Sequence, residues 1–286
     1  MLKINRRAFI GKSATGLGGL LAMSHIPSLL RAQGAINVPI GFQTFSIRNM
    51  LGKDFAGSLK TMADFGYQLV EMCSPAGYAD NGFGFLMNMK TADIKSVITD
   101  AGLSCPSCHF GFGELTTEKL DQRIQFAQDL GLTQMVCSTF SLPKTATLKD
   151  YSEAADQLNK AAEKIKGAGM QAGFHNHEME FAMLEGQLIY DALMSRFDPG
   201  LVKMQFQTEV INLGYKASAY FNKYPGRFIS SHLSDWTAER KQVPVGQGII
   251  DWKEFFAAAK TGGVQNFFVE MDFDKFKDSA VYIKRL

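Results

Sequence analysis

Short apolar segments alternate with longer amphipathic segments along residues 38–286. The short segments are rich in Val, Phe, Met and Cys and have the length of buried parallel strands. The longer segments repeat apolar residues at helical spacing, and several end in Gly, the residue typical of the position just past a helix end. The predicted strands are 38–45, 68–73, 103–110, 133–138, 170–177, 201–207, 227–235 and 265–272. The predicted helices include 54–66, 91–102, 117–131 and 150–169.

The alternation predicts an α/β fold with a parallel sheet, because each strand is followed by a helix before the next strand begins. Eight strand–helix units within about 250 residues are typical of a (β/α)8 TIM barrel. We therefore expect residues 36–286 to form one barrel domain. The alternative is an open doubly wound sheet, but the Gly-rich phosphate-binding sequence of such folds does not follow the first predicted strand.

The first 33 residues resemble an export signal rather than part of the fold. Arg6 and Arg7 precede an apolar stretch rich in Gly and Ala, as in twin-arginine signals. A Sec-type signal or a membrane anchor is the alternative, although glycines and Pro27 interrupt the stretch and make it poorly suited to span a bilayer. We expect a periplasmic protein, exported by the twin-arginine route, with no stable membrane span once residues 1–33 are removed.

Residues 1–33 also account for the positive formal charge of the chain. The chain has 30 Lys and Arg against 28 Asp and Glu, and five of the basic residues lie in this segment, which has no acidic residue. The remaining 25 basic and 28 acidic residues give the barrel segment a formal charge of −3. This balance does not favour nucleic acid as a partner.

Four cysteines, Cys73, Cys105, Cys108 and Cys137, fall in predicted strands. Cys105 and Cys108 have the spacing of a redox pair, and an oxidising compartment would permit disulfides. Because all four lie in apolar strand segments, we expect buried free thiols, with a redox pair as the alternative.

The strand period of two predicts which side chains enter the barrel. On the fifth strand Phe174 belongs to the apolar face that packs against helices, so His175 and His177 face inward. The inward set on the last four strands is His175, His177, Gln205, Gln207, Ser230, His232, Ser234 and Glu270. The outward set includes Phe174, Phe206, Ile229 and Phe267. Active sites of such barrels lie at the C-terminal ends of the strands, so the inward polar residues form the candidate site.

Four segments in this order make the chain resemble the sugar phosphate isomerase/epimerase family of xylose isomerase-like TIM barrels. They are FHNHEMEF (174–181), KYPGRFISSHLSDW (223–236), VPVGQGIIDWKEFF (243–256) and FFVEMD (267–272). The resemblance covers residues 36–286. Members of this family hold one divalent cation with Glu, Asp, His and Glu from strands five to eight and use it to polarise a hydroxy-ketone.

Applied to this chain, the resemblance implies a site for Mn, Zn, Fe or Co formed by His175, Gln207, His232 and Glu270. His232 and Glu270 match the ligand types of the family, whereas His175 stands in place of Glu and Gln207 in place of Asp. Imidazole is a good ligand for these metals. A neutral amide binds a divalent cation less strongly than a carboxylate, so Glu209 or Glu180 could supply a carboxylate instead. A metal-free polar site is the alternative.

Proton transfer is expected from Glu71, His109 or His177, each with a structural role as the alternative. Substrate contacts are expected from Asn176, Glu209, Asp235 and Trp236, where an aromatic ring can stack on a sugar and an anchor in the loop is the alternative. No cluster of Arg or Lys gathers at the predicted strand ends, which favours a neutral sugar or keto-sugar over a phosphorylated one.

Together with these residues, the resemblance implies an exported isomerase/epimerase-like enzyme that abstracts a proton next to the carbonyl of a sugar or keto-sugar with the help of a metal. A lyase or hydratase acting on 3-keto-sugars begins with the same proton abstraction and is an open alternative. A noncatalytic carbohydrate-binding barrel, whose metal site has been lost at Gln207, is the other.

Overall fold

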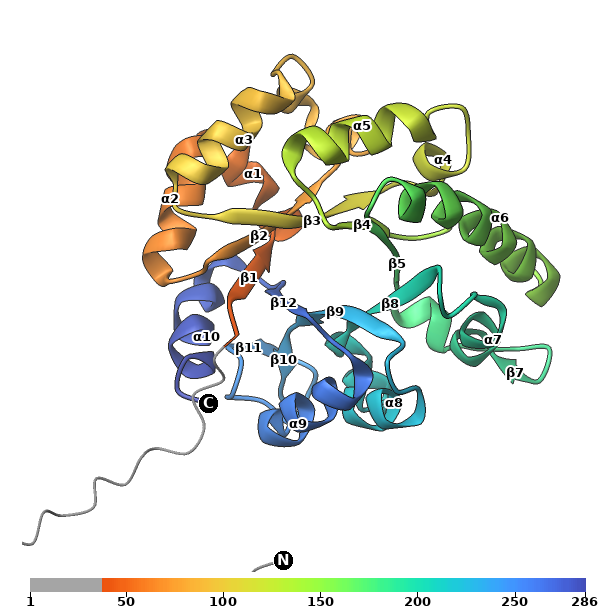
Figure 1. Cartoon of the computed structure of the whole chain (residues 1–286). Coiled ribbons are helices and arrows are strands. Elements are labelled where there is room, and N and C mark those ends of the chain that lie inside the picture. Colours follow the sequence, from red (N-terminus) through yellow and green to blue (C-terminus); the bar gives the residue numbers. More distant parts are fainter. Residues whose placement is uncertain (1–37) are drawn as a thin grey trace, which may run out of the picture. The chain divides into compact units, whose positions relative to one another are not determined.

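The computed structural model describes residues 38–286, and the predicted export signal lies outside them. Eight parallel strands close into a barrel in the order β1, β2, β3, β4, β5, β8, β9, β12, with β12 paired to β1 (Figure 1). The barrel strands are β1 Ile40–Gln43, β2 Leu69–Cys73, β3 Ser104–Phe110, β4 Gln134–Cys137, β5 Gln171–His175, β8 Val202–Gln207, β9 Phe228–Leu233 and β12 Asn266–Val269. The predicted (β/α)8 TIM barrel is confirmed, and each predicted strand contains one barrel strand.

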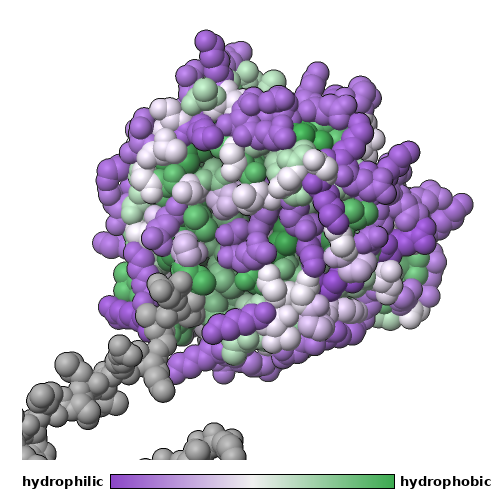
Figure 2. All heavy atoms as spheres, in the orientation of Figure 1, coloured by the Kyte–Doolittle hydropathy of each residue, from purple (hydrophilic) through white to green (hydrophobic). Residues whose placement is uncertain are grey.

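Helices form an outer ring around the strands (Figure 1). They are α1 Arg48–Leu51, α2 Phe55–Phe65, α3 Thr91–Asp100, α4 Phe112–Leu115, α5 Leu120–Leu130, α6 Leu148–Gly167, α7 Ile189–Arg196, α8 Ala217–Lys223, α9 Trp252–Gly262 and α10 Phe276–Ile283. The glycines that end α2 and α5, Gly66 and Gly131, have φ of 99° and 92°, a conformation that favours glycine. Hydrophilic residues cover much of the periphery of the face drawn in Figure 2, because the helices turn their apolar sides toward the barrel. No helix within residues 38–286 is long and apolar enough to cross a membrane.

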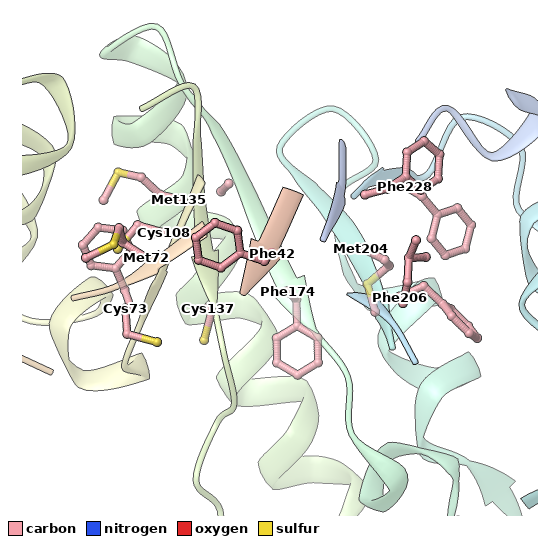
Figure 3. Packing of buried hydrophobic residues seen from close by; sticks show 14 of the residues in the cluster. Phe42, Met72, Cys73, Cys108, Met135, Cys137, Phe174, Met204, Phe206 and Phe228 are labelled. Atoms are coloured by element: carbon pink, nitrogen blue, oxygen red, sulfur yellow. The ribbon is translucent and has the colours of Figure 1, made fainter. Parts of the chain in front are cut away.

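Outward-facing strand residues build the core between barrel and helices. Phe174 and Phe206 are among the buried residues drawn in Figure 3. The ring centroid of Phe174 lies 4.5 Å from that of Phe140 and 5.4 Å from that of Phe197, and the centroid of Phe206 lies 5.6 Å from that of Phe221. Burial of each such ring contributes about 1.5–3 kcal/mol. All four cysteines are buried free thiols, which confirms the prediction made for them.

Inward-facing apolar residues close the barrel beneath the polar cluster. A Cβ on Gly41 would lie 2.5 Å from the ring of Phe268, and a Cβ on Gly173 would lie 2.9 Å from Ile229 Cδ1. Glycine at these two positions therefore makes room for large side chains inside the barrel. The prediction that Ile229 faces outward is wrong, because the pairing of β8 with β9 shifts by one residue between Met204 and Gln205. A bulge of this kind interrupts the alternation of inward-facing and outward-facing side chains along the strand.

The connections at the C-terminal ends of β5, β8 and β9 carry additional structure. The β5–α7 connection contains η4 (Glu178–Phe181) and the hairpin β6 (Met183–Leu184) and β7 (Gln187–Leu188). η5 (Thr208–Leu213) follows β8, so Glu209 lies on this 3-10 helix rather than on an extended strand. After β9 comes the hairpin β10 (Asp235–Trp236) and β11 (Gln242–Val243). The remaining 3-10 helices are η1 Phe45–Ile47, η2 Ala79–Asn81, η3 Gly84–Leu86 and η6 Phe273–Lys275.

Candidate active site

A buried carboxylate, Glu71 of β2, lies at the centre of the polar cluster inside the barrel. Its Oε1 accepts hydrogen bonds from Ser107 Oγ at 2.6 Å and Gln205 Nε2 at 2.7 Å. Its Oε2 accepts from Gln43 Nε2 at 2.8 Å and His232 Nε2 at 2.5 Å. These donors come from β3, β8, β1 and β9, so the barrel itself fixes the position of the carboxylate.

The imidazole of His232 lies between two carboxylates. Its Nε2 faces Glu71, and its Nδ1 lies 2.9 Å from Oε2 of Glu270, the residue directly after β12. The same oxygen of Glu270 accepts from Gln207 Nε2 at 2.8 Å. The side chains of His232 and Glu71 are fully buried, whereas that of Glu270 is 20% exposed. Glu270 therefore lies on the side of the ring that is accessible from the barrel mouth.

Two opposing effects set the charge states of His232, Glu71 and Glu270: burial and the charges of the neighbouring groups. Burial would lower the pKa of His232, but the negative charges of Glu270 and Glu71 raise it to about 9. Burial would raise the pKa of Glu71, but the neighbouring histidines and its hydrogen bonds lower it to about 2. Burial likewise opposes ionisation of Glu270, and His232 lowers its pKa. At pH 7 both ring nitrogens of His232 donate, and the group of three carries one uncompensated negative charge.

Three further histidines surround His232. The ring centroid of His232 lies 5.2 Å from that of His109 and 4.4 Å from that of His175, and the centroid of His175 lies 4.7 Å from that of His177. Burial lowers the pKa of all three, that of His177 to about 4, so these rings are neutral at pH 7. A buried triad is formed by His109, His175 and His232. Each offers one ring nitrogen, these three nitrogens lie within 4.8 Å of one another, and the triad could hold a metal ion.

The orientation of His109 follows from the amide of Gln205. The Gln205 nitrogen donates to Glu71 and to Ser230 Oγ, so its oxygen is the acceptor for His109 Nε2 at 2.6 Å. His109 Nε2 therefore carries the proton. The same nitrogen lies 3.3 Å from Glu71 Oε2. His109 thus supports the Glu71 network from β3.

Four buried polar atoms at the ends of β5 and β8 have no hydrogen-bond partner among the described residues. They are His175 Nδ1, Asn176 Nδ2, His177 Nδ1 and Gln207 Oε1. β5 and β8 are neighbours in the barrel, so these atoms belong to one side of the mouth. Buried polar atoms are nearly always paired in native proteins. We expect a substrate oxygen as the partner of the Asn176 amide nitrogen, and a substrate or a cation as the partner of the other three atoms.

The β5–α7 connection fixes the two residues that follow His175. Asn176 is fully buried, and its Oδ1 accepts from the Gln207 backbone N–H at 3.2 Å. The His177 backbone N–H donates to Glu180 at 2.7 Å, which caps η4. Burial raises the pKa of Glu180 to about 7. Its contacts assign Glu180 to the structure of the loop.

Asp235 organises the loop that leads to α9. Both of its oxygens accept hydrogen bonds, from the backbone N–H groups of Trp236, Gly246, Gly248 and Ile250 and from Trp252 Nε1. A Cβ on Gly248 would lie 2.2 Å from Asp235 Oδ1, which explains a glycine in this position of the VGQG segment. A substrate contact for Asp235 stays a prediction, since the described contacts already use its carboxylate.

Replacing Asp235 by Ala is expected to lower the free energy of unfolding by about 2–4 kcal/mol, because several buried donors lose a charged acceptor. Urea unfolding monitored by tryptophan fluorescence measures this change. Asp251→Ala is the matched control, because Asp251 is exposed and caps α9 through the Glu254 backbone N–H alone. The control substitution is expected to lower the free energy of unfolding by about 1 kcal/mol. Equal losses in the two variants would show that the Asp235 network does not hold the loop.

Two other predicted substrate contacts lie at the edge of the site. Trp236 is half-buried, and its Nε1 donates to Ser234 Oγ at 3.2 Å. Glu209 is half-buried on η5, and burial raises its pKa. Stacking of Trp236 on a sugar and a carboxylate contact from Glu209 stay predictions.

The sequence did not single out Gln43 and Ser107 as site residues. Gln43 is the last residue of β1, and its amide is fully buried. Ser107 lies two residues before His109 on β3, so both side chains point into the barrel. A polar residue at the end of an apolar strand was the available signal for Gln43. Their shared partner, Glu71, is on another strand and could not be inferred from either segment alone.

The fold agrees with the comparison with known families. Residues 59–283 match the family described as xylose isomerase-like TIM barrel. The match spans more than half of the chain, and the chain belongs to this family. The resemblance found in the sequence is thereby confirmed at the level of the family.

Solved structures share the fold at low sequence identity. The chain is similar to a sugar phosphate isomerase/epimerase from Parabacteroides distasonis, with 24% identity, coverage of 89% of this chain and 96% of that chain, and a TM-score of 0.72. It is also similar to a probable 3-DHS dehydratase, AsbF, from Bacillus anthracis, with 12% identity, coverage of 86% and 98%, and a TM-score of 0.64. A third similar structure is the IOLI protein with a binding zinc atom, with 12% identity, coverage of 87% and 94%, and a TM-score of 0.61. Curated proteins give no match.

Proposed function

We propose that the chain is an isomerase or epimerase-type enzyme that moves a proton next to the carbonyl of a sugar or keto-sugar, assisted by a divalent cation. The observation that carries this proposal is the group formed by His232, Glu270 and Gln207 at the ends of adjacent strands. It combines an ionised carboxylate, an imidazole and an amide oxygen with no partner. The isomerase/epimerase neighbour in the same fold supports it.

The donor set fits a divalent cation. Gln207 Oε1 and His175 Nδ1 are buried without a partner, and the ionised Glu270 accepts a hydrogen bond from the Gln207 amide nitrogen. The uncompensated negative charge of the Glu71, His232 and Glu270 group favours a cation at this position. His175, Gln207, His232 and Glu270 are thus the residues that we propose as ligands for Mn, Zn, Fe or Co, with His232 releasing its Nδ1 proton when the cation binds.

The alternative set is the triad of His109, His175 and His232. His109 Nε2 and His232 Nε2 both point at Glu71, which is fully buried and saturated with donors. His232 Nδ1 faces Glu270, which is accessible from the mouth. A catalytic cation needs a position that the substrate can reach, so we favour the Nδ1 side of the ring.

A divalent cation bound there would polarise the substrate carbonyl and lower the cost of forming an enediolate. The protein has to supply an unprotonated base near the mouth. His177 meets this requirement, because its pKa is lowered to about 4 and its Nδ1 has no partner. Asn176 Nδ2 is a free donor beside it and would orient a hydroxyl or carbonyl oxygen. We therefore assign proton abstraction to His177 rather than to His109, whose Nε2 is held by Gln205.

The burial pattern supports a neutral substrate. The buried polar side chains within residues 38–286 include Glu, Asp, His, Gln, Asn, Ser and Thr, but no Lys or Arg. A phosphorylated sugar is usually held by a cationic clamp or by a cluster of backbone N–H groups. The available donors and acceptors suit the hydroxyl and carbonyl groups of a sugar.

Metal content and proton exchange test this function together. We expect purified protein, incubated with Mn²⁺ or Zn²⁺ and desalted, to retain about one equivalent by elemental analysis, and keto-sugars to exchange an α-proton with D2O by NMR. Glu270→Gln should lose the metal, and His109→Asn should keep it. Loss of the metal in His109→Asn, with retention in Glu270→Gln, would assign the cation to the histidine triad.

The same experiment separates the alternatives that Gln207 leaves open. Turnover with loss of water from a 3-keto-sugar, instead of reprotonation, would assign a lyase or hydratase activity. Sugar binding by calorimetry without metal and without exchange for any keto-sugar would contradict an enzymatic function and favour a carbohydrate-binding barrel.

Export to the periplasm is the second part of the proposal. It rests on Arg6 and Arg7 followed by the apolar stretch of residues 13–30. Replacement of both arginines by lysine keeps the charge and is expected to leave the protein in the cytoplasmic fraction when the cells are fractionated. Unchanged export of this double variant would exclude the twin-arginine route.

A further inference from the structure

We propose that Glu71 is a positioning residue: it holds the Nε2 side of His232 so that Nδ1 is presented to the barrel mouth, and it does not itself transfer a proton. The proposal rests on the metal site of the proposed function. It differs from the expectation that Glu71 acts as a base. The contacts and the burial of these groups carry it.

The carboxylate of Glu71 is held from four sides. Two amides, one hydroxyl and one imidazole donate to it at 2.5–2.8 Å, two on each oxygen. A base must release such bonds before it accepts a proton from carbon, and each bond to a charged group is worth about 1.5–3 kcal/mol. A carboxylate with all of its acceptor positions occupied by hydrogen bonds is better suited to hold a neighbouring donor in place than to act as a base.

The His232 ring separates Glu71 from the mouth. Glu71 contacts one nitrogen of the ring and Glu270 contacts the other. The side chain of Glu71 is 0% exposed, whereas that of Glu270 is 20% exposed. A substrate that reaches Glu270 would therefore still be separated from Glu71 by the imidazole.

This arrangement matches a general requirement of metal-binding histidines. The nitrogen that does not bind the metal usually donates its N–H to a carboxylate or carbonyl, which fixes the tautomer and the orientation of the ring. Glu71 is such an acceptor for His232 Nε2, and Gln43, Ser107 and Gln205 hold it in place. Loss of an acceptor of this kind typically weakens metal binding by about 10–100-fold.

Glu71→Gln tests the proposal, because glutamine keeps the shape and removes the charge. We expect the Kd for Zn²⁺, measured by competition with a chromophoric chelator, to rise by about 10–100-fold. In 15N-histidine-labelled protein we expect the Nε2 signal of His232 to shift. The chain has five histidines, so the ring signals can be assigned by single substitutions.

Glu114→Gln is the matched control. Glu114 is a second buried carboxylate and accepts from Ser74 Oγ and the Gly111 backbone N–H beside Arg123, without contact to His232. Loss of this charge can lower the melting temperature. It should leave both the Zn²⁺ affinity and the His232 signal unchanged.

The outcomes separate this inference from the proposed function. An unchanged Kd and an unchanged Nε2 signal in Glu71→Gln would overturn the positioning role. Loss of α-proton exchange with normal Zn²⁺ affinity would also overturn it, because Glu71 would then be the base. If the wild-type protein binds no metal, the proposed metal site fails, and the positioning role is decided by the Nε2 signal of the metal-free protein alone.

Discussion

His232→Asn is expected to lower the free energy of unfolding of the metal-free protein by about 3–5 kcal/mol at pH 6.5, because it removes the buried imidazolium that lies between the carboxylates of Glu71 and Glu270. Glu71 would keep its other three donors, whereas the carboxylate of Glu270 would keep a single side-chain donor, Gln207, within residues 38–286. Urea unfolding in the presence of a chelator measures the loss. Removal of one partner leaves an uncompensated charge, which costs more than the pair itself contributes.

The size of this loss should depend on pH. The pKa of His232 is raised from 6.5 to about 9 in the folded protein, so its stabilising contribution is complete below pH 6.5 and disappears as the pH rises through 9. The difference between wild type and His232→Asn should therefore shrink at pH 9.5. His177→Asn is the control, because the His177 ring is neutral at pH 7 and its loss should cost little and show no such dependence. A constant difference between pH 6.5 and 9.5 would contradict a charged His232.

The strands were predictable because their physical signal is local. Buried parallel strands are short apolar runs, and here they are separated by amphipathic helices that end in glycines such as Gly66 and Gly131. The alternation on β5 and β8 also placed His175 and Gln207 at the mouth, because both strands are regular up to these residues.

What the sequence did not reveal depends on contacts between separate segments. The bulge that turns Ile229 inward depends on the pairing of β8 with β9, and periodicity within β9 does not reveal it. The role of Asp235 in the loop was likewise hidden from the sequence, because most of its donors lie 11–17 residues further along the chain, and its substrate contact stays a prediction. The alternation of residues along a strand shows which side chains share a face, but it does not show which residues of other segments contact them.

The roles within the cluster required the three-dimensional network. Glu71, His109 and His177 were equivalent as candidate bases when only their residue types and strand ends were known. In the structure Glu71 has a donor on every side, His109 is held by Gln205, and His177 keeps a free ring nitrogen. This distinction arises from contacts between strands that are far apart in sequence, and it is the basis on which we propose Glu71 as a positioning group and His177 as the base.

Glu270→Gln is expected to reduce kcat/KM for the exchanging keto-sugar by about 10³-fold, because the ionised carboxylate at the mouth is lost while His232 keeps its bond to Glu71. Isotope exchange at saturating metal measures the effect on activity, and elemental analysis measures retention of the cation. Gln207→Glu is the complementary variant, since it adds a carboxylate beside Glu270 and should destabilise the metal-free protein but tighten Zn²⁺ binding. Full activity of Glu270→Gln, or weaker Zn²⁺ binding by Gln207→Glu, would place the cation elsewhere in the barrel.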